Sequence, residues 1–140
     1  MDKSKLESLL HLHATPLARF LSINHWNIRC YAEACELVGA SAECIRNVDY
    51  EFATIRVDPE KFDTEEEFLD SLFHEMCHII LSPIDLYREA ATQHIEAGSV
   101  PQKQDERLWH FAIENTVINL ERLWRWGGLR EQYLERFTAG

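Results

Sequence analysis

The sequence predicts an α+β fold in a single domain that spans residues 1–140. Apolar residues recur at helical spacing towards both ends of the chain, and between about residues 26 and 57 they alternate with polar residues, as in half-buried strands. A chain of 140 residues, 46% hydrophobic and 27% charged, is long enough to bury one core. We therefore expect an N-terminal helix, a small three-stranded and mostly antiparallel sheet, a central helix and a long C-terminal helix.

The first expected element is helical. Its apolar residues follow a helical spacing, and Thr15-Pro16 in the middle resembles a cap followed by a proline at the first helical position. This dipeptide predicts either one kinked helix or two short ones. The apolar residues are Leu6, Leu9, Leu10, Leu17, Phe20 and Leu21.

Three strands are expected next. A period of two begins at Trp26, and residues 44–48 form a second candidate strand. Residues 50–57 give the clearest pattern, with Ala53, Ile55 and Val57 on one face. Asp58-Pro59 ends this strand, because proline cannot donate to the ladder.

The central helix has a marked beginning. Thr64 and Glu67 form a capping box, and the acidic first turn suits the positive end of the helix dipole. Its apolar residues surround most of the helix, which predicts burial. We expect Ser82-Pro83 to end it, followed by a shorter helix over residues 84–97, a loop over 98–104, a long helix over 105–126 ending at Gly127-Gly128, and a short helix over 129–137.

The central helix carries the most informative motif, His74-Glu75-Met76-Cys77-His78, of the form H-E-x-x-H. Two histidines four residues apart on a helix lie on one face and can reach the same metal ion. The glutamate that follows the first histidine is placed to take a proton from water at that metal. The motif predicts a metal site with Glu75 as the catalytic base.

A catalytic zinc site usually has a third protein ligand, and the sequence favours Glu114. It lies in a mostly apolar helical stretch, residues 108–120, where a carboxylate is costly unless it is paired or bound to metal. The alternative is that Glu114 belongs to a solvated stripe with His110 and Glu121. His94 is the main competing ligand, although its neighbours are polar.

Several further side chains are candidates for supporting roles. Asp85 or Glu89 could accept a hydrogen bond from a ligand imidazole. His110, Tyr50 or Tyr87 could stabilise an oxyanion. The spacing gives surface or core roles to His11, His13 and His25, a packing role to Cys77, and either a core or a docking role to the tryptophans of Trp124-Arg125-Trp126.

Composition excludes some classes of function. The formal net charge of −10 argues against a nucleic-acid-binding surface, which requires clustered lysine and arginine. No segment has the apolar length of a membrane span, and the N-terminus lacks the apolar core of a signal peptide. Four unevenly spaced cysteines suit free thiols in a reducing compartment. We expect a cytoplasmic protein with no nucleic-acid or membrane partner.

The order of these elements resembles the minimal zincin fold of H-E-x-x-H metallopeptidases. With glutamate as the third ligand, the chain is similar to small gluzincin-type proteins encoded by phages and prophages, and distantly to the ImmA/IrrE-like and SprT-like groups. The resemblance covers about residues 26–126. H-E-x-x-H is its specific motif, and residues 51–57 and 113–117 are weaker matches.

The resemblance implies that His74, His78 and Glu114 bind Zn²⁺ and that Glu75 is the general base and acid. It also implies that the strand over residues 50–57 offers its free edge to an extended peptide. The sequence departs from the pattern downstream of Glu114, where Ile118-Asn119 replaces an expected aspartate.

We therefore expect a zinc-dependent metallopeptidase that hydrolyses a peptide or protein substrate. A zincin scaffold that serves as a non-proteolytic, protein-binding regulatory module is the alternative. A purely structural zinc site is a weaker third hypothesis, because it would require a fourth protein ligand. The sequence carries no signal for an oligomeric state.

Overall fold

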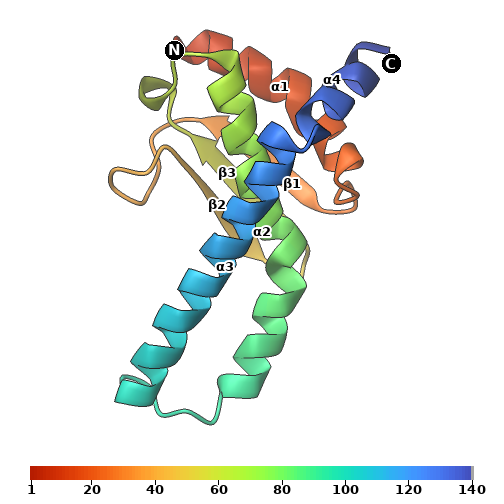
Figure 1. Cartoon of the computed structure of the whole chain (residues 1–140). Helices are drawn as coiled ribbons and strands as arrows, with labels where there is room; N and C mark the ends of the chain where they lie inside the picture. Colours follow the sequence, from red (N-terminus) through yellow and green to blue (C-terminus); the bar gives the residue numbers. More distant parts are fainter. Residues whose placement is uncertain (140) are drawn as a thin grey trace.

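The computed structural model describes residues 1–139, with side chains through Phe137, and its fold is α+β (Figure 1). A mixed three-stranded sheet is packed against helices that lie on one side of it. Along the chain the elements are α1 (Lys3–Phe20), β1 (Asn27–Ala32), β2 (Ala42–Asn47), β3 (Phe52–Val57), the 3-10 turn η1 (Pro59–Lys61), α2 (Glu65–Thr92), α3 (Val100–Trp126) and α4 (Leu129–Ala139).

The strand order in the sheet is β1-β3-β2, so β3 is the central strand. It pairs in parallel with β1 and antiparallel with β2. Mostly antiparallel pairing was predicted, and of the two strand pairs β2–β3 is antiparallel and β1–β3 is parallel. The alternation predicted for β3 is confirmed, since Ala53, Ile55 and Val57 are all fully buried.

The central position of β3 corrects one expectation. Both of its edges are occupied by neighbouring strands, so residues 50–57 offer no free edge to a peptide. The strand that pairs on one side only, and that lies next to α2, is β2. Edge position depends on strand order, which the period-two pattern of a single strand does not encode.

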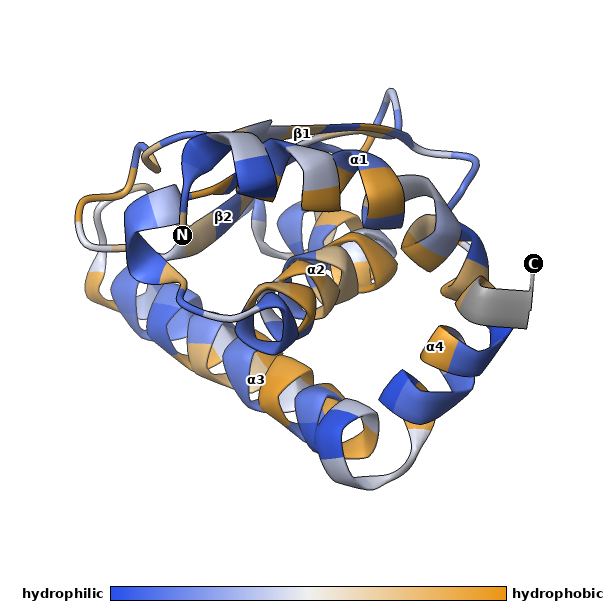
Figure 2. Cartoon of the chain, turned by 90° about the horizontal axis from the view of Figure 1, so that it is seen from above, coloured by the Kyte–Doolittle hydropathy of each residue, from blue (hydrophilic) through white to orange (hydrophobic). Residues whose placement is uncertain are grey.

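Helix α2 forms the centre of the molecule, as its circumferential apolar pattern predicted. In the view from above it lies between the sheet and α1 on one side and α3 and α4 on the other (Figure 2). The predicted capping box of Thr64 and Glu67 is present at its start. Its buried side chains form a single core with the sheet and α1, among them Phe68, Leu72, Phe73, Met76 and Ile79.

Helix α2 does not end at Ser82-Pro83 as predicted, but continues through Pro83 to Thr92. Side-chain contacts lie on both sides of the proline. The Ser82 hydroxyl and the Arg46 guanidinium of β2 both donate to the His78 carbonyl, at 2.9 and 2.6 Å. Beyond the proline, the Arg88 side chain pairs with Asp105 of α3.

Two other predicted helices also differ in extent from the expectation or narrow it. Helix α1 is one continuous helix through Pro16, because its buried face extends on both sides of the proline. Helix α3 begins at Val100 rather than near residue 105, with Ser99 as its N-cap and a proline in its first turn. Its end at Gly127 is as predicted.

The C-terminal half of α2 and the N-terminal half of α3 extend beyond the sheet as a helical arm (Figure 1).

The other halves of these two helices are joined by side-chain contacts. Phe73 of α2 stacks on Trp124 of α3 at a ring-centroid distance of 4.4 Å. Asp70 of α2 accepts hydrogen bonds from the Trp124 indole at 2.8 Å and from Arg125 and Arg130 at 3.0 Å each. These contacts fix α3 along α2 near the body of the molecule. Within residues 1–139, no helix combines the length and the apolar character needed to cross a membrane.

Helix α4 returns to α1 through a buried polar contact. His13 of α1 is 8% exposed, and its Nδ1 lies 2.8 Å from the hydroxyl of Tyr133, which is 2% exposed. Phe68 and Phe137 complete the aromatic surroundings of the His13 ring. Burial lowers the pKa of His13, partly offset by the negative charge of Glu65.

This arrangement predicts how stability depends on pH. Because burial lowers the pKa of His13 in the folded protein, the unfolded chain binds more protons than the folded protein just below the ordinary pKa of 6.5, so the free energy of unfolding falls as pH falls from 6.5. The contribution of this one residue is at most about 1.4 kcal/mol per pH unit. Denaturant unfolding of wild type and His13→Gln at several pH values measures it. The difference between the two proteins should change with pH below 6.5, and a constant difference would contradict this assignment.

Candidate metal centre

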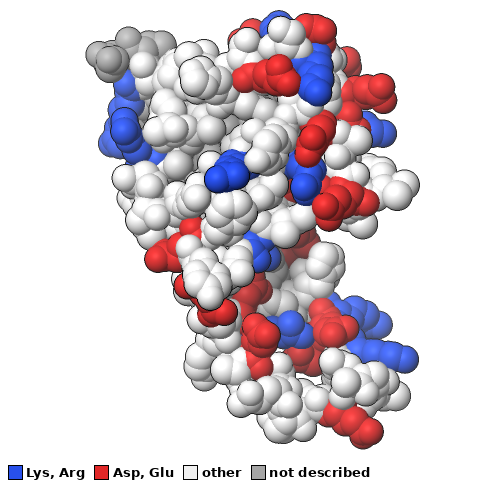
Figure 3. Space-filling view, turned by 180° about the vertical axis from the view of Figure 1, so that it is seen from behind, with Lys and Arg blue, Asp and Glu red and all other residues white. Residues whose placement is uncertain are grey.

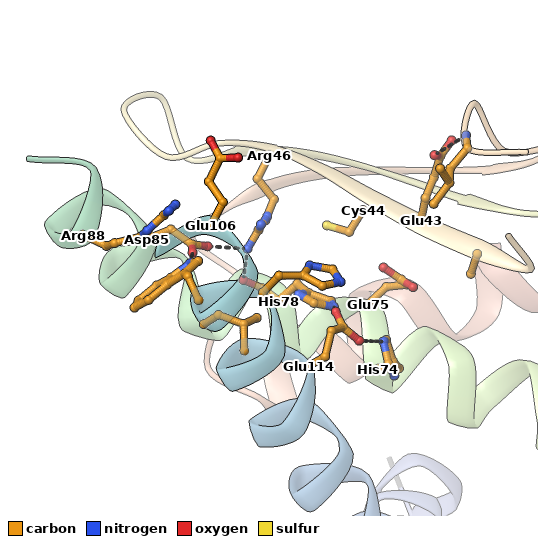
Figure 4. Close-up of a pocket in the computed structure, with 15 residues that line it drawn as sticks. Glu43, Cys44, Arg46, His74, Glu75, His78, Asp85, Arg88, Glu106 and Glu114 are labelled. Carbon is orange, nitrogen blue, oxygen red and sulfur yellow. Dashed lines mark hydrogen bonds and ion pairs between the residues drawn. The ribbon is translucent and has the colours of Figure 1, made fainter. Parts of the chain in front are cut away.

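The structure brings together the three side chains that the sequence predicts as ligands. His74 and His78 lie on one face of α2, one turn apart, and α3 brings Glu114 to the same face from the opposite side. The His78 Nε2 atom lies 3.1 Å from Glu114 Oε1, and the His74 Nε2 atom lies 3.8 Å from Glu114 Oε2. The three donor atoms all lie within 4.8 Å of one another, so the group can hold a metal ion (Figure 4).

The spacing of these atoms suits a small cation. Two donors bound to a tetrahedral ion at about 2.0–2.2 Å lie roughly 3.3–3.6 Å apart, and the two histidine–Glu114 distances, which reach different carboxylate oxygens, lie on either side of this range. All three side chains are partly accessible, at 24% for His74, 14% for His78 and 33% for Glu114. They are therefore open to an ion from solvent while standing on two packed helices.

Sequence reasoning missed the partner of His74. The Nδ1 atom of His74 forms a short hydrogen bond with Glu121, which lies on α3 two turns after Glu114. A carboxylate that accepts from Nδ1 directs the lone pair of Nε2 towards the metal position. Glu121 thus takes the role for which Asp85 and Glu89 were considered. Its spacing of seven residues from Glu114 places both glutamates on one face of a helix, and this was the signal in the sequence that could have identified it.

The surroundings shift the pKa values of the two histidines in opposite directions. Burial alone lowers the pKa of His74, but the hydrogen bond to Glu121 and the charges of Glu75, Glu121 and Glu114 outweigh it, so its pKa is raised. Burial lowers the pKa of His78 to about 4 despite the attraction of Glu114. His78 is therefore neutral at physiological pH, the form in which imidazole binds metals.

Glu75 lies beside the ligands but does not bond to them. It is 8% exposed, and it lines the same cleft between β2 and Glu114 of α3 (Figure 4). Burial raises the pKa of Glu75 to about 7, an effect moderated by His74. A carboxylate with a pKa near neutrality can both accept and return a proton at physiological pH.

Arg46 is the cation of β2 that faces this site. Its Nη1 donates to the His78 carbonyl at 2.6 Å, and to Ser82 and Asp85 at 3.3 and 3.0 Å. Asp85 in turn accepts a hydrogen bond from the Trp109 indole of α3 at 2.7 Å. Asp85 therefore anchors Arg46 and α3, and it holds His78 in place indirectly through the backbone.

The ligands and Glu75 open into a cleft of about 730 Å³ between β2, α2 and α3. Its rim includes Leu37, in the loop between β1 and β2. Glu43 accepts hydrogen bonds from the backbone amides of Glu36 and Leu37, and Arg56 pairs with Glu43 at 3.4 Å. These contacts hold the loop between β1 and β2 at the cleft, whose other walls are formed by β2, α2 and α3.

The remaining candidates lie elsewhere. His94 is exposed, one residue beyond the Gln93 C-cap of α2, and its sixteen-residue separation from His78 corresponds to about 24 Å along a helix. Tyr50 and Tyr87 are 83% and 77% exposed and do not line the cleft. His110 does line the cleft, one turn before Glu114.

The other histidines and the tryptophan pair divide between surface and core. His11 is exposed, and His25 is exposed and paired with Glu51. The packing role predicted for Cys77 is confirmed by its full burial. In the Trp124-Arg125-Trp126 segment, Trp124 is fully buried and Trp126 is 76% exposed.

Comparison of the chain with protein-family models, with curated proteins and with solved structures found no match.

The hydrogen bond of Glu121 predicts a graded effect on metal affinity. Glu121→Ala removes the acceptor of His74 without removing a ligand, so metal affinity should fall about 10- to 100-fold. Glu114→Ala should cost more, because it removes a ligand. Competition with a chromogenic chelator measures both, and Glu106→Gln, an exposed acid on α3 at the same cleft, is the control. Equal affinities for Glu121→Ala and wild type would contradict the assigned role.

Proposed function

We propose that this protein is a zinc-dependent metallopeptidase in which His74, His78 and Glu114 hold Zn²⁺ and Glu75 is the general base. The observation that carries the proposal is the position of Glu75, a carboxylate only 8% exposed next to three metal donors in an open cleft. A structural metal site has no need of such a group, and a hydrolytic site requires one.

The choice of zinc follows from the donor set. Two imidazoles and one carboxylate are the ligands of a common class of catalytic zinc sites, which leave a fourth position for water or substrate. When bound, Zn²⁺ polarises a carbonyl group and makes a coordinated water more acidic. Cys77, the cysteine within the motif, is fully buried and is not among the three donors.

The protein side chains would then have separate roles. Glu75 takes a proton from the attacking water and delivers it to the departing amine. Glu121 keeps His74 in the correct tautomer, and Arg46 holds the turn of α2 that bears His78.

An extended peptide is the substrate that the cleft suits. The residues Ala42, Cys44 and Arg46 of the edge strand β2 line the cleft beside the ligands. A peptide can add to such an edge through main-chain hydrogen bonds and so bring one of its own peptide bonds to the metal. This is the role that the resemblance had implied for residues 50–57.

Glu75→Gln tests the proposal. The substitution keeps the size of the side chain but removes the base, so kcat should fall by about 10²- to 10⁴-fold while zinc content and thermal stability are preserved. Cleavage of a peptide library followed by mass spectrometry measures activity, and Glu89→Gln, an exposed glutamate on α2, is the matched control.

Two outcomes would contradict the proposal. Unchanged cleavage by Glu75→Gln would exclude Glu75 as the base. A wild-type protein that binds zinc and cleaves no peptide in the library would favour the alternative, a zinc-containing module that binds another protein. The exposed apolar residues of the helical arm, Tyr87, Leu108 and Phe111, would suit that alternative.

A further inference from the structure

A second hollow, remote in the fold from the metal centre, lies between the C-terminal end of α1 and helix α4. It has a volume of about 560 Å³. The lining residues are Pro16, Arg19 and Phe20 of α1 and Tyr133, Arg136 and Phe137 of α4. It shares no residue with the cleft around Glu75.

The charge of this hollow is opposite to that of the chain. The protein has 24 acidic and 14 basic residues, yet two arginines and no acid line the hollow. Figure 3 shows basic side chains without acidic neighbours at the upper left of the molecule. An electropositive hollow on a protein of net charge −10 is a local attraction for an anion.

The two arginines are also free to bind a ligand. Arg56, Arg125 and Arg130 are examples of arginines that pair with carboxylates of this chain. Among the described residues, neither Arg19 nor Arg136 pairs with a carboxylate, and the Arg136 guanidinium instead lies over the Phe20 ring at 5.2 Å. Their donors, which suit a carboxylate in a bidentate geometry, remain available.

The floor of the hollow is apolar and fixed. Tyr133 is 2% exposed and held by its hydrogen bond to His13. Its ring contacts Phe20 at 5.6 Å and Phe137 at 5.9 Å between centroids. A ligand therefore finds a preformed aromatic surface next to two cations, as in sites that orient an apolar body by a few polar groups.

We propose that this hollow binds an organic carboxylate with an aromatic or branched apolar body, through Arg19 and Arg136. A singly charged anion fits better than a phosphate dianion, since two arginines must overcome the repulsion of a strongly acidic protein. The carboxylate can come from a free acid or from the C-terminal residue of a peptide.

The test is an NMR titration of the full-length ¹⁵N-labelled protein with N-acetylphenylalanine, with the uncharged N-acetylphenylalaninamide as the matched ligand. The acid should bind with a dissociation constant of about 1 mM, and at least tenfold more tightly than the amide. The largest shifts should fall on Arg19, Phe20 and Tyr133. The tripeptide Gly-Gly-Phe with a free C-terminus distinguishes the two sources: tighter binding than the simple acid indicates a peptide, and equal or weaker binding a free acid.

The variants Arg19→Gln and Arg136→Gln, combined, should abolish the preference for acid over amide. Arg107→Gln, an exposed arginine on α3 outside the hollow, should leave it unchanged. Equal binding of acid and amide to the wild type, no binding at 20 mM, or shifts confined to the metal centre would each overturn the proposal. The comparison of ligands on the wild type remains decisive if the double variant does not fold.

Discussion

The stacking of Phe73 on Trp124 is the contact on which the candidate metal centre depends. Phe73 directly precedes His74 on α2, and Trp124 follows Glu121 by three residues on α3. The stack, together with the hydrogen bond from Trp124 to Asp70, sets how α3 lies along α2. A shift of α3 by one helical turn, about 5.4 Å, would separate Glu114 from both histidines. The geometry of the site is thus set by core packing next to it.

The charges around this contact explain why a cation suits the site. Three carboxylates, those of Glu75, Glu114 and Glu121, surround two imidazoles of which His78 is neutral. Arg46 offsets part of this negative charge and is itself shared with Asp85. A divalent cation between the histidines and Glu114 would compensate the remainder and reduce the repulsion that helps to raise the pKa of Glu75.

The parts that the sequence predicted correctly are those encoded by local pattern. The capping box of Thr64, the alternation along β3 and the four-residue spacing of His74 and His78 each depend on short-range geometry. Glu114 was predicted from the cost of a carboxylate among apolar residues, and it does lie beside the histidines. Two predictions were wrong, namely the end of α2 at Pro83 and the free edge at residues 50–57. The roles of Glu121 and Arg46 were not predicted, because they depend on contacts between segments distant in the sequence.

X-ray absorption at the zinc edge tests the central claim most directly, namely that one ion is held by donors from α2 and α3. The zinc-loaded protein should show four nitrogen or oxygen neighbours at about 2.0–2.2 Å, with the multiple-scattering signature of two imidazoles. Glu114→Ala should lose one oxygen neighbour or gain a water in its place, with both imidazoles kept. A sulfur neighbour at about 2.3 Å, or a spectrum with fewer than two imidazoles, would contradict the account.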